Sequence, residues 1–228
     1  MAARTRSLPG RVFVFAFKAI LWFLLITFLW VLLYRFVPPP ITATMVLDEN
    51  GSGRDWMSLE EMDQAMAVAV IAAEDGIFCI HDGFDYEAIQ RAWEERQSGE
   101  RQRGGSTISQ QTAKNAFLWQ GGGWFRKGLE TYFTVLIEFL WDKPRIMEVY
   151  LNVAETGIGT YGANAGAQRY FGHDASQLSD LEAARIAAVL PAPKTRDATR
   201  PGSWTARYAN RLVARMGQVR ASPLDDCL

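Results

Sequence analysis

An unbroken apolar segment near the N-terminus, residues 12–37, limits most strongly how this chain can fold. Phe, Leu, Ile, Trp and Val dominate it, and Lys18 is its only charge before Arg35. A helix of roughly 20 apolar residues crosses the core of a bilayer, and a lysine near one end can extend its ammonium group to the headgroups. We therefore expect residues 12–37 to form a transmembrane anchor.

Basic residues before the apolar segment predict its orientation. Arg4, Arg6 and Arg11 precede it, and positive charge favours the cytoplasmic side of a membrane. The sequence therefore predicts a cytoplasmic tail over residues 1–11, a single span in the inner membrane and a periplasmic body. A cleaved signal peptide is the alternative, because it also runs from basic to apolar. The length of the segment and the prolines at 38–40 favour the uncleaved anchor.

Composition excludes two classes of function. The first 40 residues hold five basic residues and no acid, which leaves 19 basic against 25 acidic residues in the body. Nonspecific nucleic-acid binding needs a basic face, so no nucleic-acid partner is expected. His81 and His173 cannot build a zinc site of standard spacing with Cys79 and Cys227. Those two cysteines could form a disulfide outside the cytoplasm, but two cysteines so far apart predict no framework.

The rest of the chain is predicted to be mainly α-helical. A short stalk is expected over residues 38–53, and no alternating pattern predicts strands after it. Helices are expected where apolar residues recur at helical spacing or follow a capping residue. The predicted helices are 57–73 with Ser58 as N-cap, 85–97, 106 or 107 to 115, 126–141, 144–152 and 178–189. The last thirty or so residues carry no clear pattern.

The first of these helices runs from apolar residues directly into two carboxylates. Nine apolar residues, 65–73, are followed by Glu74 and Asp75. A carboxyl group at the edge of an apolar surface is desolvated, which raises its pKa and makes it a usable base near neutral pH. The pair could equally end a buried helix in solvent, so the pair alone leaves both interpretations open.

Two further segments concentrate groups that could bind an anion. Residues 104–115 lead from two glycines into a helix start, whose free N–H groups can face an anion or a polyol, and Lys114 could add a charge. In Arg126-Lys127-x-x-Glu130 the cations could face phosphate oxygens, with Glu130 ordering them or holding a divalent metal. Taken alone, the first segment could be a capped surface helix and the second a solvated salt bridge.

Two glycine-containing segments allow competing interpretations. Residues 157–162 match G-x-G-x-x-G, but a helix is expected before them, so we reject dinucleotide binding and expect tight turns beneath residues 170–172. Aromatic residues crowd 117–125 around three glycines. This stretch could be a buried loop or a flap that dips into a membrane, and the predicted anchor favours the flap.

Together these segments resemble the peptidoglycan glycosyltransferase family, in its monofunctional biosynthetic branch. The resemblance covers residues 57–193 and implies a lysozyme-like α-helical domain over 54–195, with a small membrane-contacting jaw and an extension over 196–228. It rests on blocks in the family's order and spacing. These are Glu74-Asp75-x-x-Phe78-x-x-His81-x-Gly83, residues 104–115, Arg126-Lys127-x-x-Glu130, Lys143-x-x-Ile146-x-Glu148-x-Tyr150-Leu151-Asn152 and residues 157–172.

The resemblance implies an inverting enzyme that polymerises lipid II into β-1,4-linked glycan and releases undecaprenyl pyrophosphate. Glu74 would deprotonate the GlcNAc 4-hydroxyl of the incoming lipid II. Glu130 would be a second catalytic glutamate, with metal or cation positioning and help to the leaving group as its proposed roles. Because pyrophosphate leaves readily, the site needs cations more than a second proton donor. The implied substrate-binding residues are Asp75, Phe78, Thr107, Gln111, Lys114, Asn115, Arg126 and Lys127, whereas His81 is expected to be structural.

The expected partners follow from the same resemblance. They are lipid II, the nascent glycan strand and membrane lipids, with cell-division or elongation proteins as further candidates and Mg²⁺ or Mn²⁺ as a candidate cofactor. Gly122 is a departure, because many relatives carry an arginine there, which puts affinity for the donor phosphates in doubt. No Ser-x-x-Lys motif occurs, and only residues 194–228 follow Pro193, so no fused transpeptidase domain is expected.

Two other classes of function stay open at this point. A lysozyme-like hydrolase or lytic transglycosylase would share the fold, but a hydrolase needs a paired acid and base with room for water. The cations and the anchor argue against it. A non-catalytic membrane scaffold in a cell-wall complex is the other class, and it would require Glu74 to be dispensable.

Overall fold

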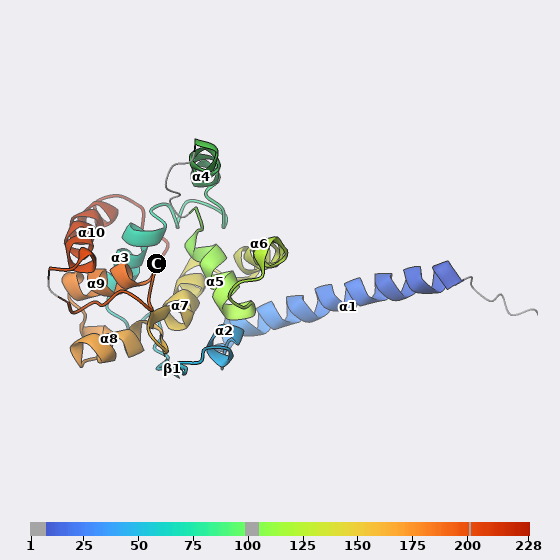
Figure 1. Cartoon of the computed structure of the whole chain (residues 1–228), viewed down its shortest axis with the longest axis horizontal. Helices are drawn as coiled ribbons and strands as arrows, with labels where there is room; N and C mark the ends of the chain where they lie inside the picture. Colours follow the sequence, from blue (N-terminus) through green and yellow to red (C-terminus); the bar gives the residue numbers. More distant parts are fainter. Residues whose placement is uncertain (1–7, 99–104, 201) are drawn as a thin grey trace, which may run out of the picture. The chain divides into compact units, whose positions relative to one another are not determined.

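A computed structural model describes residues 8–98, 105–200 and 202–228 (Figure 1). The chain divides into two compact units at Pro38. The first unit holds one helix, α1 (Leu8–Phe36). Within it, Arg11–Phe36 spans 26 residues with a mean hydropathy of 2.5, which is long and apolar enough to cross a membrane. The predicted N-terminal helix is confirmed and is a candidate membrane anchor.

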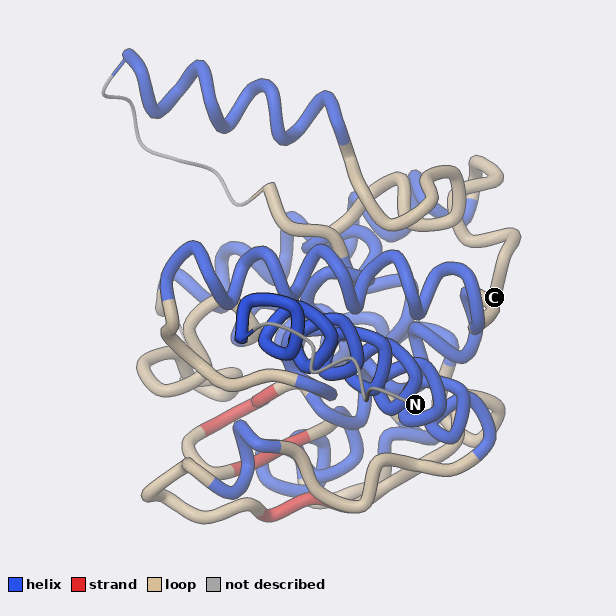
Figure 2. The backbone as a smooth tube through the Cα atoms, turned by 90° about the vertical axis from the view of Figure 1, so that its right-hand side faces the viewer, coloured by secondary structure: helices blue, strands red, loops and turns tan. Residues whose placement is uncertain are grey.

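The second unit, residues 39–228, consists of helices and one small sheet (Figures 1 and 2). Its helices are α2 (Ala43–Val46), α3 (Gln64–Glu74), α4 (Tyr86–Ser98), α5 (Ile108–Phe117), α6 (Gly123–Leu140), α7 (Lys143–Val153), α8 (Ala163–Phe171), η1 (Ala175–Gln177), α9 (Asp180–Val189) and α10 (Trp204–Arg220). The strands are β1 (Gly53–Arg54), β2 (Glu155–Gly157) and β3 (Thr160–Tyr161). They lie in the order β1-β3-β2, with β1 parallel and β2 antiparallel to β3. The predicted mainly α class is confirmed.

Helix α3 forms the centre of the core. Every residue from Ala65 to Ala72 is buried, as a helix that is apolar on all sides requires. It packs against α9 and α10, whereas α5 packs against α6 and α7 (Figure 1). Glu74, the last residue of α3, thus comes directly after the best-buried segment of the body.

The start of α3 differs from the prediction. Ser58 and Glu61 close a separate turn, in which Ser58 N and Ser58 Oγ donate to Glu61 Oε2 at 3.1 and 2.7 Å. Helix α3 begins at Gln64, where Asp63 is the N-cap and its Oδ1 accepts from Ala65 N at 2.8 Å. The prediction of a helix over 57–73 was wrong at its N-terminus, because a serine and a glutamate at this spacing can close a turn without a helix behind it.

The remaining predicted helices agree with the structure to within three residues at each end. The chain also contains elements that the sequence pattern did not indicate. Residues 38–53, the predicted stalk, contain α2, which contacts α5. The patternless C-terminal segment contains α10, whose buried residues Thr205, Ala209, Leu212, Met216 and Val219 recur at helical spacing. Strands of two or three residues are too short to show alternation.

A disulfide joins Cys79 to Cys227, with 5.5 Å between the two Cα atoms. It ties the loop that follows Glu74 to the C-terminal end of the chain. The sequence left this pairing open, because the two residues are 148 positions apart and only the fold brings them together.

Candidate active site

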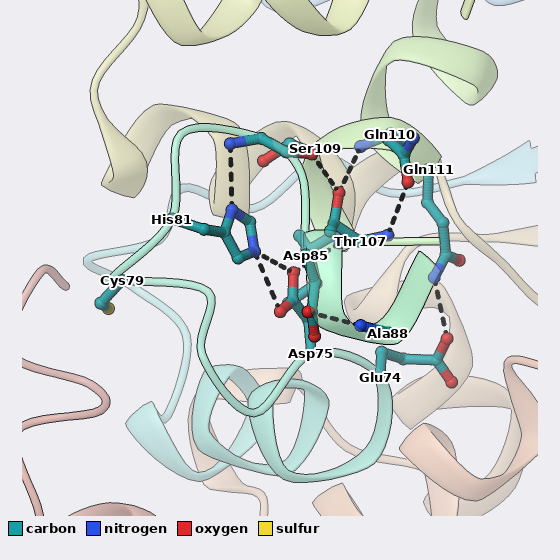
Figure 3. Close-up of polar contacts among 12 residues, drawn as sticks. Glu74, Asp75, Cys79, His81, Asp85, Ala88, Thr107, Ser109, Gln110 and Gln111 are labelled. Atoms are coloured by element: carbon teal, nitrogen blue, oxygen red, sulfur yellow. Dashed lines mark hydrogen bonds and ion pairs between the residues drawn. The ribbon is translucent and has the colours of Figure 1, made fainter. Parts of the chain in front are cut away.

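Glu74 has the environment of a proton acceptor. Burial raises the pKa of its carboxyl group, and this effect outweighs a hydrogen bond from Gln111 and the positive charges of Arg196 and Lys114, which lower it. Gln111 Nε2 donates to Glu74 Oε2 at 2.8 Å (Figure 3). A carboxylate with a raised pKa accepts a proton more readily near neutral pH, which suits a general base.

Asp75 connects α3 to α5 (Figure 3). Its Oδ2 accepts from Ile108 N at 2.9 Å and lies 2.9 Å from His81 Nε2. On the other side of the ring, His81 Nδ1 accepts from Gly83 N at 3.0 Å. The Gly83 carbonyl oxygen in turn accepts from Thr107 Oγ1 at 2.7 Å. This network fixes the loop after Glu74 against the start of α5, which agrees with the structural role expected for His81.

The N-terminus of α5 is occupied by groups of the protein itself. Thr107 and Gln110 form a capping box, with Gln110 N donating to Thr107 Oγ1 at 3.1 Å and Thr107 N donating to Gln110 Oε1 at 3.0 Å. The Ile108 N–H is taken by Asp75. A carboxylate at a helix N-terminus is favoured by the helix dipole. One of the N–H groups that could have faced an anion, that of Ile108, therefore holds Asp75.

Glu130 on α6 is the centre of a cluster of cations. The residue is 3% exposed, and its two carboxylate oxygens pair with Arg126 Nη1 and Lys127 Nζ, each at 2.5 Å. Lys114 from α5 lies close enough that Glu130 raises its pKa, although burial lowers that pKa by more. Three positive side chains thus surround one carboxylate, and the cluster retains positive charge that an anionic leaving group can use.

These residues do not fit a metal ion. Glu130 was the candidate ligand, but both of its oxygens are held by Arg126 and Lys127, whose charges would repel a divalent cation. Across residues 8–98, 105–200 and 202–228, no group of three or more His, Cys, Asp or Glu side chains could hold a metal.

A cleft of about 630 Å³ lies beside these groups. Of the predicted substrate-binding residues, Gln111, Lys114 and Asn115 line it. The other predicted site residues do not line it, namely Glu74, Asp75, Phe78, Thr107, Arg126, Lys127 and Glu130. The Phe78 ring instead packs under the Lys143 ammonium group, 4.7 Å from the ring centroid.

The cleft also contains residues that sequence reasoning missed. Tyr161 OH donates to Asp48 Oδ2 at 2.7 Å, and Lys194 Nζ lies 3.1 Å from Asp48 and 3.8 Å from Glu155. Glu155 Oε1 and Thr44 Oγ1 are buried with no hydrogen-bond partner among the described residues. These side chains come from separate segments, so no motif joins them in the sequence.

The aromatic segment is buried in its first part and exposed in its last part. Phe117 and Leu118 are buried, whereas Trp124 and Phe125 are 77% and 73% exposed.

Gly122 has a φ of +80°, and a Cβ atom there would lie 2.8 Å from the Cβ atom of Arg126. An arginine at this position would therefore need a different backbone, so Gly122 represents more than the loss of one cation.

Comparisons with known proteins agree with this geometry. A family model described as Transglycosylase matches residues 41–217. The biosynthetic peptidoglycan transglycosylase of Caulobacter vibrioides is 51% identical over 201 residues, which cover 87% of this chain and 88% of the relative. The proteins of the same name from Pseudomonas aeruginosa and Xanthomonas axonopodis pv. citri are 48% and 49% identical, covering 89% and 83% of this chain and 91% and 81% of the relatives.

The chain therefore belongs to the transglycosylase family. By this membership it is an enzyme, a peptidoglycan glycosyltransferase, and the hydrolase alternative is not favoured.

Proposed function

We propose that the chain polymerises lipid II into β-1,4-linked glycan strands, with Glu74 as the general base. The observation that carries the proposal is the arrangement of α3 and α6. A carboxylate with a raised pKa lies at the end of α3, and three cations gather around Glu130. Lys114, which joins the cation cluster, also lies close enough to lower the Glu74 pKa. A base and an anion-binding cluster are what this glycosyl transfer needs.

These groups account for each bond and each proton in the proposed reaction. The Glu74 carboxylate takes the proton of the GlcNAc 4-hydroxyl of one lipid II, and that oxygen attacks the anomeric carbon of the lipid-linked strand. The new C–O bond forms opposite the bond to pyrophosphate, which breaks and inverts the configuration. Undecaprenyl pyrophosphate leaves with the bonding electrons, and Lys114, Arg126 and Lys127 stabilise its negative charge.

Glu130 acts in this proposal as a positioning residue. Both of its oxygens bind cations, so neither is available to take a proton. Its task is to hold Arg126 and Lys127 together where the pyrophosphate departs. No step uses a protein-bound metal, and the requirement for Mg²⁺ or Mn²⁺ is tested by adding a chelator to the polymerisation assay.

The site of action is proposed from α1 and from the exposed aromatic residues at the start of α6. We place α1 in the inner membrane with the N-terminus in the cytoplasm and the body in the periplasm, supported by Arg4, Arg6 and Arg11. The exposed Trp124 and Phe125 suit contact with membrane lipids. A C-terminal reporter that is active only outside the cytoplasm tests this orientation. Cell-division or elongation proteins stay predicted partners.

The deciding experiment incubates the full-length chain with labelled lipid II and resolves the products on a gel. The wild type should produce a ladder of glycan strands, and Glu74→Gln should lower the rate by roughly 10²- to 10⁴-fold while still binding lipid II. Glu60→Gln, at an exposed position, is the matched control and should polymerise normally. Polymerisation by Glu74→Gln at the wild-type rate would remove Glu74 from the role of base.

A further inference from the structure

A second group of cations lies in a hollow next to the cleft. This hollow, of about 350 Å³, is lined by Arg169 on α8 and by Arg196 and Arg200 in the segment between α9 and α10. Residues 193–195 line both the hollow and the 630 Å³ cleft. The two spaces are therefore adjacent, so a ligand bound in the cleft has the hollow next to it.

Arg196 is held rigidly in this position. Its Nη1 donates to the carbonyl oxygen of Ala188 at 2.8 Å, and its guanidinium carbon lies 4.3 Å from the centroid of the Trp204 ring. Its positive charge also reaches Glu74, whose pKa it lowers. A guanidinium fixed in this way loses little freedom when it binds an anion, which favours binding.

The positive charges of the three arginines are only partly balanced within the protein, because Arg196 acts on Glu74 and Arg200 acts on Asp197. Arg169 Nη1 donates to uncharged groups, the Ile158 carbonyl oxygen at 2.9 Å and Thr160 Oγ1 at 2.7 Å. Among the described residues, none of the three arginines forms an ion pair. The one carboxylate in the lining, Asp197, accepts hydrogen bonds from Thr199 N and Oγ1, both at 2.7 Å.

The neighbouring lysine differs from these arginines. Lys194 also lines the hollow, but its ammonium group lies 3.1 Å from Asp48 and 3.8 Å from Glu155. The positive charge of Lys194 is thus balanced by these two carboxylates. The excess positive charge of the hollow therefore comes from guanidinium groups, whose planar donors match a carboxylate.

We infer that the hollow formed by Arg169, Arg196 and Arg200 binds carboxylate groups of the peptide stem on the muramic acid of lipid II. This inference rests on the proposed function. Lipid II carries negative charge in two places, the pyrophosphate and the stem. The pyrophosphate is assigned to the cations around Glu130, which lie on helices α5 and α6. The stem is the anionic branch that remains, and the hollow lies next to the cleft.

The test compares two substrates with the full-length enzyme. One is lipid II with free stem carboxylates, and the other is the same molecule with these carboxylates converted to carboxamides. Arg169→Gln and Arg200→Gln should each raise KM for the carboxylate substrate about tenfold, since each removes a charge-assisted contact. Neither should change KM for the carboxamide substrate. Arg215→Gln, at an exposed position on α10, should change neither value.

The outcomes separate the possible explanations. If both variants raise KM equally for the two substrates, the arginines act on the pyrophosphate or on folding, and the inference is wrong. If neither variant changes KM, the hollow does not bind substrate, and the inference is again wrong. If the wild type polymerises neither substrate, the proposed function has failed instead. Arg196 is left out of this test, because its charge acts on Glu74 and a change there would also alter the base.

Discussion

The two glutamates of the site, one at the end of α3 and one in α6, show how differently the same side chain can be used. At Glu74, burial raises the pKa by more than the Gln111 hydrogen bond and the charges of Arg196 and Lys114 lower it. Glu130 is also buried, but each of its oxygens has a cation. Burial that outweighs nearby positive charge prepares a carboxylate to take a proton, whereas a buried carboxylate with a cation on each oxygen holds those cations in place.

The largest effect that separates the two glutamates should come from removing each charge. Glu130→Gln leaves Arg126 and Lys127 unpaired beside a buried site, so the free energy of unfolding should fall by about 3–5 kcal/mol. Glu74→Gln removes a charge whose ionised form is disfavoured by burial, so this variant should be more stable than the wild type at pH 7. Denaturant unfolding of both variants measures the difference. Equal destabilisation by both would contradict the comparison.

The difference in stability between Glu74→Gln and the wild type should depend on pH. The Glu74 pKa is raised in the folded state from its ordinary value of 4.5. Ionisation therefore costs stability as the pH rises above 4.5, and the advantage of Glu74→Gln should disappear below that pH. An advantage that persists unchanged at lower pH would assign it to another cause.

The disulfide should have the next largest effect, and it holds the loop that follows Glu74. Cys79 and Cys227 close a long loop of chain, so replacing both with serine should lower the free energy of unfolding by about 2–5 kcal/mol. A reductant should produce a similar loss in the wild type. The double serine variant is the control, because it should not respond to reductant, and a response there would show a different target.

Gly122→Ala should destabilise the region around Arg126 and Glu130, with a smaller loss of free energy of unfolding. A left-handed φ and a close approach to Arg126 both oppose a side chain, so we expect a loss of about 1–3 kcal/mol and slower polymerisation. Gly128→Ala in the same helix is the matched control, since a Cβ there meets nothing within 4 Å and φ is ordinary. That control should be neutral or stabilising. The two variants behaving alike would remove the argument from backbone geometry.

The smallest effect should come from Gln111→Ala, which changes the setting of Glu74. The Gln111 hydrogen bond lowers the Glu74 pKa, so its removal should raise that pKa further. The acidic limb of the profile of kcat/KM against pH should move to higher pH by up to about one unit. Gln177→Ala, at an exposed position on η1, should leave the limb in place. An unmoved limb in Gln111→Ala would separate Glu74 from the observed titration.

Much of this structure could be predicted from local patterns in the sequence. The apolar run of α1, the buried run that ends at Glu74 and the spacing of Arg126, Lys127 and Glu130 are all visible in the sequence. In each case the signal and the structure involve neighbouring residues. Prediction failed at the start of α3, because Ser58 and Glu61 satisfy the same local pattern without a helix behind them.

The helical class, the candidate anchor and the identity of the groups that can perform the chemistry follow from the sequence alone. Which of these groups come into contact depends on the folded arrangement of the chain. In the tertiary structure, Asp75 binds the N-terminus of α5, Cys79 pairs with Cys227, and Arg196 lies near Glu74. These contacts join segments far apart in the chain, and their energies depend on burial and on partners that no local pattern contains.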